Sequence, residues 1–217
     1  MNRDALIDYS WYEFCRTTIA LGATLGFRIR YFGQNNLPKK GGFLMVSNHQ
    51  SHLDPPLIGA GCPRQMSFVA RKTLFDIPIL GPLINRLHAI PIDRTGMGIS
   101  GIKESLRRLK HGDPILLFPE GTRTKTGEIG SFLPGFTALA VRSKVPIVPA
   151  AIEGAYQAWP RSHNFPRPGQ VDVWFGRPIE PAVIQKLDER ELLQTVEQQV
   201  RQCFTDLRHQ RQKSGRR

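Results

Sequence analysis

Six short apolar runs, spaced along the chain, constrain its fold more than any other feature of the sequence. They are rich in β-branched and aromatic residues and lie at 43–46, 68–70, 89–92, 115–118, 147–152 and 171–175. Most are apolar at every position rather than at alternate ones, which is typical of strands buried on both faces of a parallel sheet. The runs therefore predict a mainly parallel central sheet.

Between the runs, apolar residues recur at the three- and four-residue spacing of amphipathic helices. The pattern is clear over 99–109, short over 136–142 and longest over about 189–207. Strands that alternate with helices predict an α/β domain whose sheet is wrapped by helices. A chain of 217 residues is long enough to build one such domain around a single core.

The N-terminal segment, residues 1–35, differs from this domain, which we expect over 36–207. Its uncharged stretch at 17–27 is shorter than the roughly 20 apolar residues of a membrane-spanning helix. Aromatic residues and arginines flank that stretch, a pattern that favours a helix lying in a membrane interface. A helix packed against the protein core is the alternative. Asp4 and Asp8 interrupt the place where the apolar part of a signal peptide would begin, so we expect none.

The chain is strongly basic, with 30 Lys and Arg against 18 Asp and Glu and a net charge of +12. Such a charge predicts anionic partners: an anionic lipid surface, a phosphorylated substrate or nucleic acid. Residues 208–217 hold five of the basic residues and no acid, and we expect them to form a flexible basic tail. Cys15, Cys62 and Cys203 are too few and too widely spaced for a disulfide framework or a zinc site, so we expect reduced thiols and no metal.

The first polar motif, Asn-His-Gln-Ser-His-Leu-Asp-Pro-Pro at 48–56, directly follows a predicted strand. His49 and Asp54 would lie about 140° apart on a continuous helix, so they meet only if the chain turns between them. The two prolines favour such a turn and a helix that begins near Asp54. Asp54 then accepts a hydrogen bond from one ring nitrogen of His49 and leaves the other free as a general base. In the alternative interpretation, Asp54 is only an N-cap and His49 an ordinary loop residue.

The second motif, Phe-Pro-Glu-Gly-Thr-Arg at 118–123, follows another predicted strand, and open α/β sheets bind ligands at the ends of their strands. Its glycine permits a tight turn, its glutamate offers acceptors to hydroxyl groups, and the planar fork of its arginine suits a phosphate. An exposed turn with an ion pair is the alternative. Basic residues also follow two other predicted strands. The candidates for substrate binding are therefore Lys72, Arg94, Glu120, Gly121, Thr122 and Arg123.

Four motifs occur in one order: His-x-x-x-x-Asp at 49–54, Ile-Asp-Arg at 92–94, the run at 118–123, and Val-Pro-Ile-Val-Pro-Ala at 145–150. With this order the chain resembles the 1-acylglycerol-3-phosphate acyltransferases, the lysophospholipid acyltransferase family, over about 40–180. The resemblance implies transfer of a fatty acyl group from an acyl thioester to the sn-2 hydroxyl of 1-acylglycerol 3-phosphate, which gives phosphatidic acid. It also implies a mainly parallel sheet wrapped by helices, held to the membrane by an N-terminal helical segment.

The resemblance also implies roles for single residues. His49 matches the catalytic base of the family, Asp54 its partner, and Arg94 the arginine of its second block. The acceptor-binding loop of the family corresponds to Glu120, Gly121 and Arg123. The acyl donor is then acyl-CoA or acyl carrier protein, with no other cofactor and no nucleic acid partner. The acyltransferase domain at 36–207 would act at the cytoplasmic face of a membrane with an anionic surface.

One position departs from the family pattern. The family often shows Phe-Lys-x-Gly after the third motif, whereas this chain has Phe-Leu-Pro-Gly at 132–135. Leu133 cannot bind a phosphate, so either other basic residues suffice or the acceptor is different. A different acceptor would be another lysophospholipid, glycerol 3-phosphate or a lyso-aminolipid. A non-enzymatic basic protein that binds membranes or nucleic acid is the remaining alternative; it explains the net charge but not the polar motifs.

The expected reaction is direct transfer, in which His49 removes the proton of the acceptor hydroxyl as that oxygen attacks the thioester carbonyl. Ser51 is the nearest contender for a nucleophile, but it does not stand beside a base in a clear nucleophile arrangement, so we expect no acyl-enzyme. Backbone N–H groups at the helix start after Asp54 are our candidates for stabilising the oxyanion. We expect His52 to support the structure of the motif.

Overall fold

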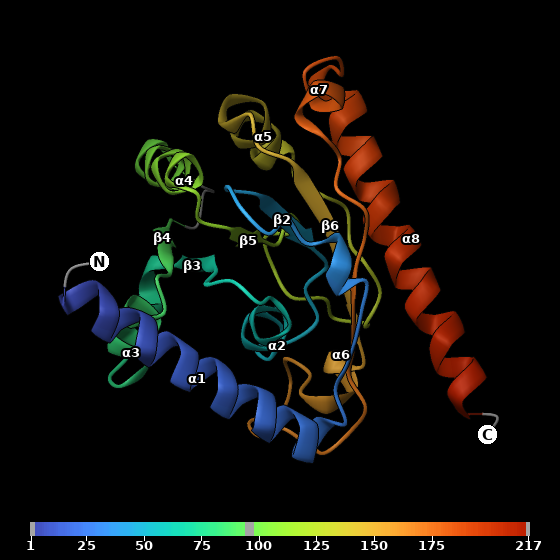
Figure 1. Ribbon diagram of the computed structural model, residues 1–217. Helices are drawn as coiled ribbons and strands as arrows, with labels where there is room; N and C mark the ends of the chain where they lie inside the picture. The colour runs from blue at the N-terminus through green and yellow to red at the C-terminus, as the bar shows by residue number, and fades with distance from the viewer. Residues whose placement is uncertain (1–2, 94–97, 216–217) are drawn as a thin grey trace.

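The computed structural model describes residues 3–93 and 98–215 (Figure 1). Within them, seven strands form one sheet in the order β1-β7-β6-β2-β5-β3-β4, and every neighbouring pair is parallel except β6 and β7. The strands are β1 (Arg30–Phe32), β2 (Leu44–Ser47), β3 (Ser67–Arg71), β4 (Ile90–Ile92), β5 (Ile115–Leu117), β6 (Ile147–Glu153) and β7 (Asp172–Phe175). This confirms the predicted α/β class and the mainly parallel sheet.

Helices cover both faces of the sheet. The α-helices are α1 (Arg3–Phe27), α2 (Asp54–Gly61), α3 (Leu80–Arg86), α4 (Ile99–His111), α5 (Thr137–Ser143), α6 (Ala155–Ala158), α7 (Pro181–Ile184) and α8 (Glu189–Gly215). Short 3-10 helices are η1 (Gln34–Asn36), η2 (Lys72–Leu74) and η3 (Pro134–Phe136). Figure 1 shows α8 on one side of the sheet and α1 and α2 on the other.

Side chains that alternate along a strand belong to two separate cores. On β2, Leu44 and Val46 pack with α4, α5 and α8, whereas Met45 packs with α1 and α2. Because both faces are covered, every residue of β2, β5 and β6 is buried. That double burial is the reason why these strands are apolar at successive positions in the sequence.

Strand β1 has no counterpart among the apolar runs. It is three residues long and only partly buried, so it carries little hydrophobic signal. It pairs with β7, and both run opposite to the other strands of the sheet. An ion pair supports this pairing, because Arg30 Nε donates to Asp172 Oδ1 at 2.6 Å and the carboxylate is fully buried.

The expected flexible tail is wrong for the residues that the structure describes. Helix α8 continues without a break from Glu189 to Gly215. The reason is electrostatic: Arg208 Nε lies 3.7 Å from Glu153 Oε2, and Arg211 Nε lies 3.6 Å from Asp172 Oδ2. Both carboxylates are buried, and a buried charge needs a partner, so the basic residues hold this end of the chain against the sheet.

Helix α1 packs against the core of the protein, as one of the two alternatives predicted, and it also exposes apolar side chains. Tyr12 and Ala23 are buried in contact with the rest of the protein, and Tyr12 Oη accepts a hydrogen bond from the Met66 N–H. Burial raises the pKa of Tyr12 to about 12. Leu21 and Leu25 are exposed on the same helix. Among the described residues, no helix is both long and apolar enough to cross a bilayer.

Candidate active site

Loops that follow three adjacent parallel strands meet at one edge of the sheet. Strand β5 lies between β2 and β3, and all three run in the same direction. The first polar motif leaves the end of β2, and the second leaves the end of β5. Arg71 is the last residue of β3. The parallel arrangement therefore brings motifs that are about 70 residues apart in the sequence to one place, where open α/β sheets bind ligands.

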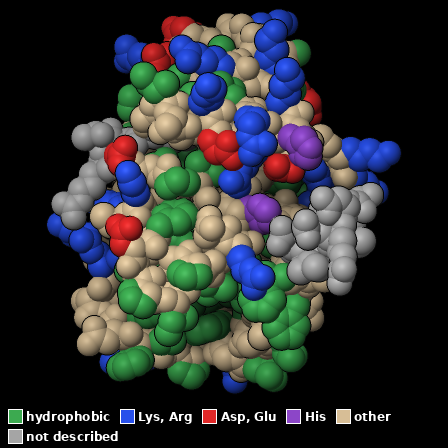
Figure 2. Space-filling model, turned by 90° about the vertical axis from the view of Figure 1, so that its left-hand side faces the viewer, with side chains coloured by type: hydrophobic (Ala, Val, Ile, Leu, Met, Phe, Trp, Pro, Cys, Tyr) green, Lys and Arg blue, Asp and Glu red, His purple; other side chains and the backbone are tan. Residues whose placement is uncertain are grey.

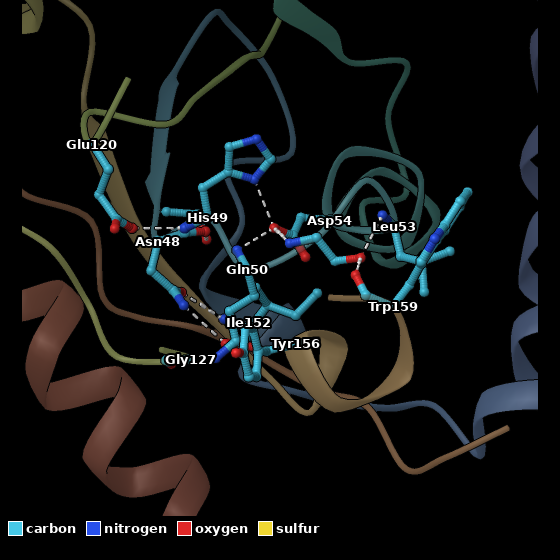
Figure 3. A network of polar contacts seen from close by, with 12 residues as sticks. Asn48, His49, Gln50, Leu53, Asp54, Glu120, Gly127, Ile152, Tyr156 and Trp159 are labelled. Atoms are coloured by element: carbon cyan, nitrogen blue, oxygen red, sulfur yellow. Dashed lines mark hydrogen bonds and ion pairs between the residues drawn. The ribbon is translucent and has the colours of Figure 1, made fainter. Parts of the chain in front are cut away.

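His49 and Asp54 are in direct contact, as the sequence predicted. The Nδ1 atom of His49 lies 2.7 Å from Asp54 Oδ2, and the Asp54 side chain is completely buried (Figure 3). The same oxygen also accepts the backbone N–H groups of Gln50 at 2.5 Å and Ser51 at 2.7 Å. Three donors converging on one carboxylate oxygen fold the loop back on itself and bring the ring and the carboxylate together.

This geometry determines which nitrogen of His49 is available. Asp54 Oδ2 already accepts two backbone N–H groups, so the Nδ1 atom that faces it is assigned as a third donor, and in the neutral imidazole Nε2 then carries the lone pair. The imidazole ring stacks on Phe118 with ring centroids 4.1 Å apart and an interplanar angle of 16°. The ring is thus held by a hydrogen bond at one edge and by an aromatic face, as a general base requires.

Asp54 does not act as an N-cap, so that alternative is wrong. Asp54 is the first residue of α2, the N-cap residue is Leu53, and the cap has no side-chain hydrogen bond. The expected oxyanion donors at this helix start are also wrong. Pro55 and Pro56 have no N–H, the Asp54 N–H donates to Ser51 O, and the Leu57 N–H donates to Leu53 O.

Glu120 joins the two motif loops through backbone hydrogen bonds. Its Oε1 accepts the His49 N–H at 2.7 Å, and its Oε2 accepts the Gly130 N–H at 2.8 Å. Burial raises the pKa of this carboxyl, and the two hydrogen bonds oppose that shift. The sequence predicted that Glu120 binds substrate; what the structure shows is that its two oxygens accept backbone N–H groups, one of them from the catalytic histidine candidate.

Cationic groups gather beside this carboxylate framework. The Nη1 atom of Arg123 is buried and has no hydrogen-bond partner among the described residues. Burial and the nearby charges of Arg161 and Arg71 lower the pKa of the Arg123 guanidinium. Arg71 Nη2 also donates to Gly121 O at 3.3 Å. An unpaired, partly desolvated guanidinium among other cations is suited to an anion.

The other predicted substrate-binding residues make fewer contacts with the His49–Asp54 pair and the residues around it. Gly121 has a φ of +65°, as its tight turn requires, and Thr122 is exposed on the same loop. Lys72 is exposed at the start of η2, and within the described part of the chain it is Arg71 that contacts the acceptor loop. Arg94 lies outside the described residues.

His52 packs against Trp159, which directly follows α6. Its ring centroid lies 5.5 Å from that of Trp159, and Ser51 Oγ donates to Trp159 O at 2.8 Å. Partial burial, with the nearby charges of Arg123 and His49, lowers the pKa of His52 to about 4. His52 is therefore uncharged at neutral pH, which suits the supporting role that the sequence predicted.

Two neighbours of His49 were missed by the sequence reasoning. The Asn48 side-chain amide donates to Ile152 O at 3.0 Å and accepts the Ile152 N–H at 2.9 Å, which ties the loop to β6. The Gln50 amide is likewise buried and hydrogen-bonded. The available signal was two amide residues flanking a histidine directly after a strand, but their partners are about 100 residues away in the sequence.

Comparisons with known proteins agree with this geometry. The acyltransferase family model matches residues 28–153, more than half of the chain. The 1-acyl-sn-glycerol-3-phosphate acyltransferase of Bacillus subtilis is 29% identical over 197 residues, which cover 90% of this chain and 96% of that protein. The protein of the same name from Pseudomonas aeruginosa is 32% identical over 188 residues, 82% of this chain and 72% of that protein. The crystal structure of the 1-acyl-sn-glycerophosphate (LPA) acyltransferase from Thermotoga maritima superposes with a TM-score of 0.83 at 28% identity, covering 96% of this chain and 84% of that one.

The convergence of three donors on Asp54 predicts how two substitutions at this position differ. Asp54→Ala leaves buried N–H groups without an acceptor and should lower the free energy of unfolding by about 3 kcal/mol or more. Asp54→Asn keeps one carbonyl oxygen for the three donors and should cost about 1 kcal/mol. Urea unfolding of both variants followed by circular dichroism measures the difference. Equal destabilisation would show that these hydrogen bonds do not hold the loop.

Proposed function

The chain belongs to the acyltransferase family, and from this premise we propose that it acylates the free sn-2 hydroxyl of 1-acylglycerol 3-phosphate to give phosphatidic acid. The observation that carries the proposal is the His49–Asp54 pair, with its hydrogen bond of 2.7 Å and its free Nε2. The names of the relatives from B. subtilis and P. aeruginosa support this acceptor. The structural match to the T. maritima enzyme supports it independently.

The proposed reaction transfers the acyl group directly. Nε2 of His49 takes the proton of the acceptor hydroxyl as its oxygen bonds to the thioester carbonyl carbon. The tetrahedral intermediate then collapses, the C–S bond breaks, and the imidazolium returns the proton to the leaving thiolate. Asp54 stabilises the imidazolium in between, because its buried carboxylate faces Nδ1. General-base assistance of this kind is typically worth about 10²–10⁴-fold in rate.

Arginines bind the acceptor phosphate in this proposal. The unpaired Nη1 of Arg123 is the first candidate donor, and Arg71 and Arg161 add positive charge around it. A phosphomonoester dianion would replace the missing partner of Arg123 and neutralise this cluster. Leu133, where the family often has lysine, is exposed and lies against Gly121, beside the backbone oxygen that Arg71 binds. Arg71 therefore stands where it can supply the charge that Leu133 lacks.

The exposed Leu133 supports a second candidate acceptor. Leu133 removes one cation from the acceptor loop, and this favours a headgroup with less negative charge than a phosphomonoester. Such acceptors include lysophospholipids with a phosphodiester headgroup and lyso-aminolipids. The chemistry at His49 would be unchanged, so the two candidates differ only in the headgroup that they present to Arg123.

The acyl donor is a thioester, and the enzyme works at a membrane. Acyl-CoA or acyl carrier protein supplies the thioester, and the reaction requires no further cofactor. The three cysteines are unpaired, which fits a reducing compartment and hence the cytoplasmic face of a membrane. The acceptor is a lipid, so the enzyme meets it at a membrane surface.

Exposed apolar side chains support a membrane-facing surface. They lie on α1 and around α3 and comprise Phe14, Leu21, Leu25, Ile77, Ile79 and Leu83. The two helices are neighbours, since the guanidinium of Arg86 lies 5.2 Å from the centroid of the Trp11 ring. Figure 2 shows hydrophobic side chains gathered on the lower part of one face, below histidine and basic side chains at its centre. An apolar surface of this kind suits insertion into the headgroup region.

The first test removes the base. Purified protein in detergent is given 1-acylglycerol 3-phosphate with palmitoyl-CoA or with palmitoyl carrier protein, and phosphatidic acid is measured by mass spectrometry. His49→Ala should lower the rate at least about 100-fold, whereas His111→Ala, which changes an exposed histidine, should not. The donor that supports wild-type turnover is thereby identified. No product with either donor would contradict the acceptor, and full activity of His49→Ala would contradict the mechanism.

The second test concerns the acceptor phosphate. Arg123→Ala should raise the KM for 1-acylglycerol 3-phosphate about tenfold or more, because a charge-assisted hydrogen bond to phosphate is lost. Lys125→Ala removes the same charge from an exposed position of the same loop and is the matched control. Equal effects of the two substitutions would show that Arg123 acts only through net charge.

The third test concerns membrane binding. The double variant Leu25→Glu/Ile79→Glu should reduce binding to phosphatidylglycerol-containing vesicles about tenfold or more, because two apolar side chains can no longer be buried. Val183→Glu changes an exposed apolar residue on α7 and serves as the control. Vesicle flotation measures the bound fraction. Undiminished binding of the double variant would exclude this surface.

A further inference from the structure

Gln50 connects the His49–Asp54 pair to a buried carboxylate that the reaction does not use. It is 1% exposed, and its backbone N–H is one of the three donors to Asp54 Oδ2. Its side chain points the other way, where Nε2 donates to Gly127 O at 2.8 Å and to Glu153 Oε2 at 3.2 Å (Figure 3). Its Oε1 accepts the Tyr156 N–H at 3.2 Å. One residue therefore touches the site through its backbone and three other segments through its amide.

The partner of Gln50 that matters most for its role is the buried carboxylate of Glu153. It is the last residue of β6, is 6% exposed, and its pKa is raised by burial. Arg208 on α8 lies 3.7 Å from its Oε2, at the edge of ion-pair distance, and also binds Glu128 at 2.6 Å. The shorter polar contact of Glu153 is therefore the one with Gln50. A buried carboxylate in this position requires a neutral or cationic donor from the loop.

We propose that Gln50 is a positioning residue, which fixes the backbone N–H that Asp54 binds by anchoring its own side chain to Glu153, Gly127 and Tyr156. This inference rests on the proposed function, because it assigns a role in the same acyl transfer. Gln50 touches neither the acceptor nor the reacting atoms in this account. It acts through Asp54, whose carboxylate orients the His49 ring.

A negatively charged side chain at position 50 would be repelled by Glu153. A glutamate at position 50 would place a second carboxylate about where Nε2 now lies, 3.2 Å from Glu153 Oε2, and like charges at that distance repel. Converting Glu153 to glutamine at the same time exchanges donor and acceptor between the two positions. The glutamate at 50 would then accept from the new amide and still accept the Tyr156 N–H, but Gly127 O would lose its donor, so the rescue is partial. The pair is therefore open to a rescue experiment.

The experiment measures kcat and KM for four proteins with 1-acylglycerol 3-phosphate and the donor that supports wild-type turnover. Gln50→Glu should lower kcat about 10–100-fold, with the acceptor KM changed less than about threefold, because a displaced base slows the chemical step. Glu153→Gln alone should stay within about threefold of the wild type. The double variant should recover kcat about threefold or more over Gln50→Glu without reaching the wild type, because the hydrogen bond to Gly127 O is not restored.

A matched control separates positioning from general destabilisation. Gln170 Nε2 donates to the buried Asp172 Oδ2 at 2.9 Å, next to β7 and outside the catalytic loop. Gln170→Glu inserts the same like-charge contact there. It should lower the thermal midpoint as Gln50→Glu does, but leave the kcat of the folded protein within about twofold. An equal loss of kcat in this control would overturn the positioning role.

A second variant keeps the test decisive if Gln50→Glu does not fold. Gln50→Met keeps the length of the side chain without its hydrogen bonds, so it should lower kcat but should not be rescued by Glu153→Gln. In nuclear magnetic resonance spectra, the His49 Nδ1–H signal, assigned by its loss in His49→Ala, should move or broaden in Gln50→Met and not in Gln170→Glu. An unchanged signal and unchanged kcat would overturn the inference. An inactive wild type with an altered His49 signal would instead contradict only the proposed function.

Discussion

The structure of the site depends on one buried carboxylate oxygen, Oδ2 of Asp54. Two backbone N–H groups and the His49 ring converge on it within 2.7 Å. A carboxylate that is completely buried is tolerable only when such donors compensate for its lost hydration. The same compensation forces the loop to fold back, and this turn brings together two side chains that a continuous helix would hold apart. The chemistry and the local fold therefore share one cause.

The sheet supplies a rigid frame for this turn. Asn48 and Gln50 tie the loop to β6, and Glu120 ties it to the loop after β5. The catalytic loop therefore lies between elements from both sides of β2 and is held by side-chain amides and a carboxylate. Both oxygens of Glu120 and Oδ2 of Asp54 accept hydrogen bonds, whereas Asp54 Oδ1 and Arg123 Nη1 are buried without a partner among the described residues. That difference leaves a positive, partly desolvated place beside the base, which is what a phosphorylated lipid requires.

The first and the last helix, α1 and α8, pack against the rest of the protein through different kinds of contact. Helix α1 buries Tyr12 and Ala23 but leaves Leu21 and Leu25 exposed, so it is both part of the core and an apolar surface. Helix α8 buries one side against the sheet, and its basic end compensates carboxylates on β6 and β7. The basic residues near the end of the chain were predicted to be free in solvent because their acidic partners are far away in the sequence. Tertiary contact turned them into structural residues.

The sequence by itself determined the parallel sheet, because burial on both faces leaves strands that are apolar at every position. It also determined the two polar loops and made the pairing of His49 with Asp54 one of two interpretations, since the prolines that follow favour a turn and a helix start; the structure excluded the N-cap alternative. Only the tertiary structure decided the occupation of Glu120 by backbone donors, the contact of Arg71 with Gly121 and the anchoring of Gln50 to Glu153. The physical reason is that hydrophobic periodicity and turn chemistry act over a few residues, whereas a hydrogen bond between buried polar groups joins positions that become neighbours only once the sheet is assembled.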